Sequence, residues 1–392
     1  MSSVALTNIA TLVTNSAALG DGLLGLSAMK TLVIEDGKVA ALSDRVPEGV
    51  DEVIDCSGRT VLPGFVDSHT HLVFAGDRSA EFRARMQGEK YTAGGINYTV
   101  EKTRLATRET LFSNVKSLVS EANSTGTTTL EIKSGYGLTP AHEKRSLDIA
   151  REFTEETTFL GAHVVPSEFI GNADEYVSLV IGEMLDEVKA SSKWIDVFCD
   201  LGAFNPEQSE AILRAGIARG MGARIHANQL EAGKGVAIAV ALDAASADHV
   251  SKSTSADIEL LASSNTVATL LPGVEFSTHI QAGLGRRFLD AGATVAIASD
   301  CNPGSSYTTS MPFCIASAVS LLGFTVEEAV RAATLGGAQA LRRTDIGRLS
   351  VGMRADLILL QTPSYIHLAY RPGVNLIHST YKSGRAVTSW QK

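Results

Sequence analysis

The feature that most constrains the fold is a regular alternation of two kinds of segment between Phe65 and Asp300. Short apolar or β-branched runs, each ending in polar residues or glycine, alternate with stretches of helical character. There are about eight such runs, which is the number of strands in a TIM barrel. The sequence therefore predicts an α/β fold, a (β/α)8 barrel of the TIM type.

A doubly wound parallel sheet is the competing fold, because it has the same alternation of strand and helix. Its dinucleotide-binding form carries a GxGxxG motif directly after the first strand. No such motif follows the first barrel-type strand, VLPGFVD. The barrel is therefore favoured.

The two ends of the chain differ from this central region, because both are rich in short β-like runs. The string TLVIEDGKVAAL, from Thr31 to Leu42, predicts a hairpin around Asp36-Gly37. Near the C-terminus, GRLSVGMRADLILLQ again has strand character. We expect residues 1–62 and 344–392 to pair into one small β-sandwich domain beside a barrel of residues 63–343.

Composition narrows the setting and the partners. The net charge of −9 argues against nucleic acid or an anionic membrane as the main partner. Four widely spaced cysteines fit a reducing compartment. The first residues show no signal peptide, and no run reaches the roughly 20 apolar residues of a membrane helix. We expect a cytoplasmic protein with a small-molecule substrate, and a homodimer.

Histidines stand at the ends of several predicted strands. His69 and His71 follow the first one, and residues two apart on a strand point to the same face. An HxH pair alone is a weak signal, but His163, His226 and His249 each end a later strand, so that five of the nine histidines occupy such places. Imidazole is a common ligand of zinc and iron. This convergence predicts a metal or catalytic centre.

Asp300 ends the last predicted strand, TVAIASD, where an isolated buried carboxylate is costly unless it is paired or bound to a metal. Three histidines, one aspartate and a water suit zinc or iron(II). Asp300 would ligate the ion and accept a proton from its water. His249, which is not needed as a ligand, would orient or deprotonate that water.

Several loop residues are candidates for holding the substrate. Arg78 and Arg83 follow the first strand, and an arginine beside a metal site can bind a carboxylate through two parallel hydrogen bonds. Either one alone is equally consistent with a solvated loop arginine. Tyr91 and Tyr136 lie in glycine-containing segments that we expect to form loops. CNPGSS, at 301–306, offers backbone N–H groups and hydroxyls.

These residues resemble those of the amidohydrolase superfamily over nearly the whole chain. The resemblance is carried by VLPGFVDSHTH, the strands of His226 and Asp300, and the closing GRLSVGMRADLILL. Five longer strings are similar to those of its imidazolonepropionase family: HTHLVFAGDRSAEF, EIKSGYGL, TTFLGAHVVP, ASADHV and SDCNPGSS. The combination is specific, whereas HxH alone is not.

The resemblance implies a ligand set, substrate contacts and a reaction. One divalent ion, zinc or iron, would be held by His69, His71, His226 and Asp300, with His249 near the attacking water. Substrate or product would be contacted by Arg78, Tyr91, Tyr136, His163, Asn302, Gly304 and Ser305. The implied reaction is hydrolysis of the ring amide of 4-imidazolone-5-propionate to N-formimidoyl-L-glutamate in histidine degradation, by attack of metal-bound hydroxide on the ring carbonyl.

Two positions qualify the resemblance. Related deaminases, and some imidazolonepropionases, have glutamate where this chain has Gln229, three residues after His226. Glutamine takes up no proton at neutral pH, which weakens a deaminase activity. In a ring hydrolase, His249 and Asp300 would handle the protons while Gln229 hydrogen-bonds the ring. Binuclear relatives bridge two ions with a carboxylated lysine, but we expect Lys133 to be structural and the site to hold one ion.

Two alternative functions are left open. Another amidohydrolase, such as a heterocycle aminohydrolase, would release ammonia from amino-heterocycles and leave imidazolone propionate intact. A non-catalytic barrel that binds a small ligand would purify without zinc or iron, and His69→Ala would not change its properties.

Overall fold

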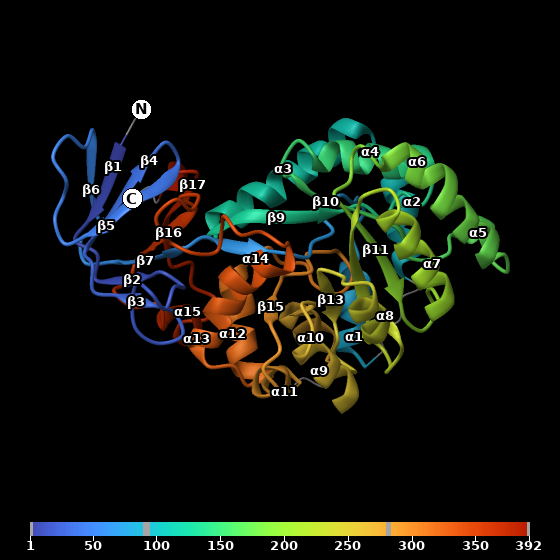
Figure 1. The fold of residues 1–392 in the computed structure, drawn as a ribbon. Helices are drawn as coiled ribbons and strands as arrows, with labels where there is room; N and C mark the ends of the chain where they lie inside the picture. Colours follow the sequence, from blue (N-terminus) through green and yellow to red (C-terminus); the bar gives the residue numbers. More distant parts are fainter. Residues whose placement is uncertain (1–2, 89–94, 280–283, 390–392) are drawn as a thin grey trace.

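A parallel β-barrel occupies the centre of the computed structural model, which describes residues 3–88, 95–279 and 284–389 (Figure 1). Its eight strands are hydrogen-bonded in sequence order. They are β8 (Phe65–Asp67), β9 (Thr127–Lys133), β10 (Glu156–Ala162), β11 (Trp194–Cys199), β12 (Gly222–Ala227), β13 (Ser246–His249), β14 (Val267–Leu270) and β15 (Val295–Ile297). The predicted (β/α)8 barrel is confirmed.

The seam between the first and last strands closes just beyond the end of β8. There a parallel bridge joins Thr70 to Cys301. The N–H of His71 donates to the carbonyl of Cys301, and that of Asp300 donates to the carbonyl of His69, each at 3.0 Å. Candidate ligands from opposite ends of the barrel sequence are thereby brought together.

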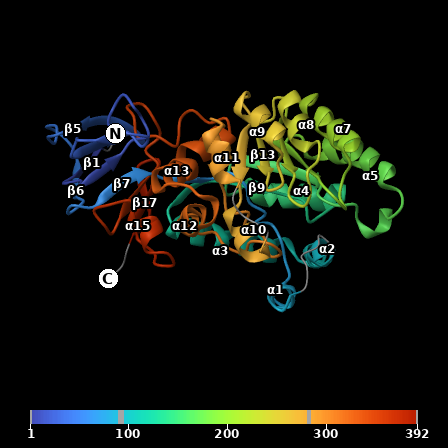
Figure 2. The same ribbon diagram turned by 90° about the horizontal axis from the view of Figure 1, so that it is seen from below.

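Helices follow the strands and surround the barrel (Figure 1). They are α1 (Ser79–Met86), α2 (Ile96–Leu105), α3 (Arg108–Ser124), α4 (Pro140–Ala150), α5 (Ala173–Leu179), α6 (Leu185–Val188), α7 (Pro206–Ile217), α8 (Gly235–Ala241), α9 (Ser255–Ala262), α10 (Pro272–Thr278), α11 (Gly285–Asp290), α12 (Met311–Leu322), α13 (Val326–Arg331), α14 (Gly337–Ala340) and α15 (His367–Tyr370). Figure 2 shows α1 and α2 projecting beyond the ring of barrel helices. None of the helices in the described part of the chain has the length and apolar character needed to cross a membrane.

Helix α3 illustrates how the sequence positions these helices. The Thr107 side chain accepts a hydrogen bond from the N–H of Thr110 and so caps the N-terminus. Its buried residues recur every three or four positions, which turns one face toward the barrel: Leu111, Val115, Leu118 and Ala122. The helix ends just before Gly126, whose φ of +95° favours glycine.

The helix expected over Thr325–Leu341 contains a π-helical turn, Ala332–Gly336, between α13 and α14. Two glycines let this region approach the barrel closely. A Cβ on Gly336 would lie 2.2 Å from the carbonyl oxygen of Val295, and one on Gly337 would lie 2.2 Å from that of Val66. The segment therefore packs directly on the first and last strands, beside the seam.

Two smaller sheets form a domain at the side of the barrel, and they combine strands from both ends of the chain (Figure 1). One contains β5 (Lys38–Ser43), β4 (Thr31–Glu35), β1 (Ser3–Thr7) and β6 (Glu52–Asp55). The other contains β18 (Arg385–Ser389), β17 (Ile377–Lys382), β16 (Leu357–Leu360), β7 (Thr60–Pro63), β2 (Thr11–Val13) and β3 (Leu26–Ser27). Strand β7 pairs with β16, so the terminal segments share a sheet as predicted.

A common apolar core holds this small domain together. Leu6 and Ile34 from the N-terminal segment pack in the same cluster as Leu357 and Tyr381 from the C-terminal one. The predicted hairpin is also present, because β4 and β5 pair around Asp36-Gly37, both of which have positive φ. The domain boundaries at 62/63 and 343/344 stay predictions.

Candidate active site

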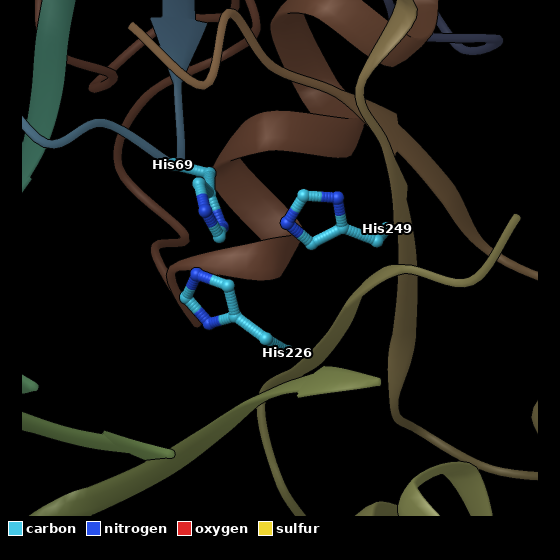
Figure 3. A group of neighbouring side chains, drawn as sticks. All are labelled: His69, His226 and His249. Carbon is cyan, nitrogen blue, oxygen red and sulfur yellow. The ribbon is translucent and has the colours of Figure 1, made fainter. Parts of the chain in front are cut away.

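Six buried polar side chains meet at the carboxyl ends of the barrel strands, where TIM-barrel active sites lie. They are His69, His71, His163, His226, His249 and Asp300. Three of the rings, those of His69, His226 and His249, face one another in Figure 3. The convergence expected from the sequence is therefore present in the fold.

Four of these side chains bring their donor atoms to one point. The Nε2 atom of His71 lies 3.3 Å from that of His69 and 3.4 Å from that of His226. The Oδ1 atom of Asp300 lies 3.3 Å from the Nε2 atoms of both His69 and His71. Four donors placed about 2.05 Å from an ion at tetrahedral corners are roughly 3.3 Å apart. The spacing fits a zinc-sized ion.

The hydrogen bonds of the donor set also fit a metal. The Oδ1 atom of Asp300 is buried without a hydrogen-bond partner, which an ion would satisfy. His69 donates from Nδ1 to Oδ2 of Asp248 at 2.7 Å, and His226 donates from Nδ1 to Oδ1 of Asp196 at 3.1 Å. Each bond fixes the tautomer that leaves Nε2 free to bind the ion.

The charges around the donors call for a cation. The groups hydrogen-bonded or ion-paired around them comprise two cations, Lys133 and Arg224, and four carboxyl groups, Glu131, Asp196, Asp248 and Asp300. Although burial opposes it, Arg224 and His69 hold the pKa of Asp248 well below its usual range. A divalent ion would balance the remaining negative charge.

His249 lies directly beside the donor set. Its ring centroid is 5.6 Å from that of His69 and 5.3 Å from that of His226. The backbone at His249 turns sharply, with a φ of +73°, and this ends β13. Burial lowers the pKa of His249 well below its usual value, so the imidazole is neutral and can accept a proton. A second group of close donors, His69, His226 and His249, is also present.

A cavity with roughly 350 Å³ of empty space opens onto the donors, a volume suited to a small molecule. Its wall contains the predicted residues Arg78, Tyr136, His163, Gln229, Asn302 and Ser305. Tyr91, which was also predicted, lies outside the described residues. Ile96 and Phe198 line the cavity too, although neither was predicted. Phe198 could have been identified by its place in the strand WIDVFC, whereas Ile96 carries no comparable signal.

The two candidate arginines are separated by the fold. Arg83 is exposed, whereas Arg78 is buried in the cavity wall. Arg78 donates from Nε and Nη2 to the two carboxylate oxygens of Glu81, each at 2.8 Å. A Cβ on Gly304 would lie 2.2 Å from Nη1 of Arg78, so this predicted residue contacts the guanidinium closely. The guanidinium is thereby held in one orientation.

Asn302 organises the loop that follows Asp300. Its Oδ1 atom accepts hydrogen bonds from the N–H groups of Gly304 and Ser305, each at 2.8 Å. Its Nδ2 atom donates to Oδ2 of Asp300 at 3.0 Å. The Asn302 amide therefore holds the second oxygen of Asp300 while Oδ1 faces the histidines.

Aromatic and amide groups form the opposite wall of the cavity. His163 donates from Nδ1 to the carbonyl of Gly135 at 3.0 Å, and its ring stacks on that of His71 at 5.2 Å. Tyr136 lies 5.2 Å from His163 by ring centroids. Gln229 is held by its backbone N–H, which donates to Asp200. Planar and polar groups thus face each other across the cavity.

Lys133 is fully buried behind the donor set. Its Nζ atom lies 2.8 Å from Oδ2 of Asp196 and 2.9 Å from Oε1 of Glu131. Although burial opposes it, these two carboxylates raise the pKa of Lys133. A charged ammonium in two close ion pairs contributes to the structure, as we expected.

Comparisons with known proteins agree with this geometry. The model of the Amidohydrolase family matches residues 60–387. An imidazolonepropionase of Mycolicibacterium smegmatis is 57% identical, and the match covers 100% of this chain and 98% of the relative. One of Streptomyces griseus is 54% identical, with coverage of 99% and 100%.

Solved structures share the fold at low identity. An adenosine deaminase from Xanthomonas campestris with bound zinc has a TM-score of 0.73 at 18% identity, covering 98% of this chain and 93% of the other. A triazine hydrolase from Arthrobacter aurescens has a TM-score of 0.76 at 16% identity, covering 99% and 95%.

The family match and the donor set together indicate a hydrolase that uses a divalent metal ion and acts on a small molecule. The relatives align over essentially their whole length, so the match includes the small domain as well as the barrel. The chain therefore belongs to the amidohydrolase family and, within it, to the imidazolonepropionases.

Proposed function

We propose that this protein hydrolyses the ring amide of 4-imidazolone-5-propionate to N-formimidoyl-L-glutamate, a C–N bond cleavage in histidine degradation. The observation that carries the proposal is the single cavity whose wall contains both the metal donors and Arg78. A small ring that bears a carboxylate can contact both ends of such a cavity. The names of the relatives, which are 53–57% identical, support the same substrate.

The proposed metal ligands are His69, His71, His226 and Asp300, and the ion is zinc or iron(II). When bound, the ion supplies a Lewis acid that polarises the ring carbonyl and lowers the pKa of water. Borderline nitrogen donors with one carboxylate suit either metal. Elemental analysis of the purified protein distinguishes zinc from iron.

The propionate end of the substrate is assigned to Arg78. The guanidinium is planar and always charged, and it matches a carboxylate through parallel hydrogen bonds. Glu81 holds its Nε and Nη2 atoms, so the arginine is oriented before substrate arrives. We also assign Tyr91 to the substrate, on the family resemblance alone.

The ring end is assigned to the remaining residues of the site. Tyr136, His163 and Gln229 are placed to contact the ring and its nitrogens. The loop residues Asn302, Gly304 and Ser305 are assigned to the polar end of the substrate or product. These groups hold the ring carbonyl toward the donors, and such orientation lowers the barrier to attack.

His249 and Asp300 handle the protons. A ring nitrogen of the neutral His249 accepts a proton as water adds to the ring carbonyl. The C–N bond of the ring then breaks, and the leaving nitrogen takes up a proton. One water is consumed, and the product carries one new carboxylate and one formimidoyl group. Gln229 takes part only as a hydrogen-bonding group, because its amide does not titrate.

The test follows the ultraviolet absorbance of imidazolone propionate with wild-type protein and with Asp300→Asn. We expect loss of the substrate signal with the wild type and almost none with the variant. Asp290→Asn, at an exposed position on α11, is the control and is expected to retain activity. Ammonia release from amino-heterocycles, with imidazolone propionate untouched, would instead identify a heterocycle aminohydrolase.

We further propose that the enzyme works in the cytoplasm as a homodimer, with neither nucleic acid nor membrane as a partner. Its net charge of −9 supports the absence of anionic partners. Light scattering with size exclusion measures the oligomeric state. The proposed domain limits are 1–62 and 344–392 for the small domain and 63–343 for the barrel.

A further inference from the structure

A cluster of buried ionic groups lies directly behind the metal donors. Its centre is Lys133 at the end of β9, whose Nζ atom lies 2.9 Å from Glu131, 2.8 Å from Asp196 and 3.9 Å from Asp248. All four side chains are inaccessible to solvent. One ammonium thus faces three carboxyl groups from three strands, β9, β11 and β13.

Two of these carboxyl groups hold proposed metal ligands. Asp196 accepts from Nδ1 of His226 at 3.1 Å, and Asp248 accepts from Nδ1 of His69 at 2.7 Å. In each case the carboxyl group contacts Lys133 through Oδ2. The position of the ammonium therefore influences two imidazoles that come from different strands.

The third carboxyl group holds the backbone between two ligands. The Oε2 atom of Glu131 accepts from the N–H of Thr70 at 3.0 Å, while Oε1 contacts Lys133. The Thr70 hydroxyl in turn donates to the Glu131 carbonyl at 2.6 Å. Since Thr70 stands between His69 and His71, this link fixes the relative placement of both imidazoles.

The branch to His226 depends most strongly on Lys133. Asp248 has a second cation, because Nη2 of Arg224 lies 3.3 Å from its Oδ2 atom. Within the described ranges, the only lysine or arginine in an ion pair with Asp196 is Lys133. Removing the ammonium would leave Asp196 as a buried anion that draws a proton or shifts, and the hydrogen bond that orients His226 would change with it.

We propose that Lys133 is a positioning residue for the metal site. Its ammonium holds Asp196, Asp248 and Glu131 in the places from which they orient three of the four ligands. Lys133 touches neither the ion nor the substrate in this arrangement. The inference rests on the proposed ligand set and is independent of the proposed substrate.

The test compares Lys133→Met, which keeps the length of the side chain and removes its charge, with wild type. Apoprotein is titrated with Zn²⁺ against a chromophoric chelator, and with Co²⁺ while the visible ligand-field spectrum is recorded. We expect Zn²⁺ affinity to fall about 10- to 100-fold, the range found when partners of ligating histidines are removed. The Co²⁺ bands should change in position or intensity, because they report ligand geometry.

Lys193→Met is the matched control. It also breaks a lysine–carboxylate ion pair, with Glu156 at 2.8 Å, but at the opposite end of the strands. It should bind Zn²⁺ like wild type and leave the Co²⁺ spectrum unchanged. Melting of each apoprotein establishes that the variants are folded.

A second variant covers the case in which Lys133→Met does not fold. Glu131→Gln keeps the shape of the hub and removes one of its charges, and we expect a smaller loss of Zn²⁺ affinity, about 3- to 10-fold. Unchanged Zn²⁺ affinity with an unchanged Co²⁺ spectrum, in a folded Lys133→Met or otherwise in Glu131→Gln, would overturn the inference. Metal binding that depends on Lys133 without turnover of imidazolone propionate would overturn only the proposed function.

Discussion

Asp67 and Ser299 join the first and last strands of the barrel. The N–H of Ser299 donates to Oδ1 of Asp67 at 3.0 Å, and its hydroxyl donates to Oδ2 at 2.5 Å. Asp67 ends β8 and Ser299 follows β15, so this pair completes the seam. In the sequence, Asp67 only strengthened the case for the neighbouring histidines, whereas in the fold it holds the two edges of the barrel together.

We expect Asp67→Ala to destabilise the protein by about 2–4 kcal/mol, because it leaves the buried N–H of Ser299 without an acceptor. Asp67→Asn retains one acceptor oxygen and should lose less. Urea unfolding of the apoproteins measures the difference without a contribution from bound metal. Equal stability of Asp67→Ala and wild type would show that the seam does not need this contact.

The two possible donor groups, which share His69, are distinguished by single substitutions. We expect His71→Ala to lose most of its bound metal, because it removes one of four donors. His249→Ala should retain close to one ion per chain and lose about 10²- to 10⁴-fold in kcat, the usual contribution of a general base. Elemental analysis and steady-state kinetics give both quantities. Metal loss in His249→Ala with retention in His71→Ala would favour the other group.

Arg78 and Arg83 provide a matched pair for the substrate carboxylate. We expect Arg78→Ala to raise KM about 100-fold, because a charge-assisted bidentate contact contributes roughly 3 kcal/mol. Arg83 is exposed on α1, and Arg83→Ala should keep a KM close to that of wild type. Equal effects of the two substitutions on KM would remove Arg78 from the carboxylate site.

Gln229 predicts the shape of the pH profile. In Gln229→Glu, burial would raise the pKa of the new carboxyl group and add an ionisation between about pH 5 and 7 to kcat/KM. The wild-type profile should lack this ionisation. Gln339→Glu, at an exposed position on α14, should leave the profile unchanged. Identical profiles for wild type and Gln229→Glu would mean that this position does not face the reacting groups.

Glu275 makes the stability of the fold depend on pH. Burial raises its pKa to about 7, and Oε2 has no hydrogen-bond partner. Below the unfolded pKa near 4.5 the group is protonated in both states. As pH rises through about 7, ionisation is penalised only in the folded protein, so stability falls.

Glu275→Gln should therefore match wild type near pH 4.5 and become more stable by up to about 3 kcal/mol at pH 8. Urea unfolding at the two pH values measures this gap. Glu259→Gln, at an exposed position on α9, is the control and should show no such gap. A gap of the same size at both pH values would mean that burial of the charge is not its cause.

The sequence by itself predicted the barrel and the location of the site. Strands and helices have different periodicities, so the alternating segments could be counted, and the ends of parallel strands share one face. That rule was enough to bring His226 and Asp300 to the HxH pair before any coordinates existed. The hairpin at Asp36-Gly37 was equally accessible, because its turn chemistry is local.

Only the tertiary structure decided which side chains act together across the barrel. Arg78 and Arg83 look alike in sequence, and their difference arises from the packing around α1. Asp67 and Ser299 are 232 residues apart, and Lys133 and Asp196 are 63 apart. No local pattern encodes a hydrogen bond between such residues, because its existence depends on how neighbouring strands align in the closed barrel. The histidine pair indicated where a metal binds, and the fold decided which buried charges hold those histidines in place.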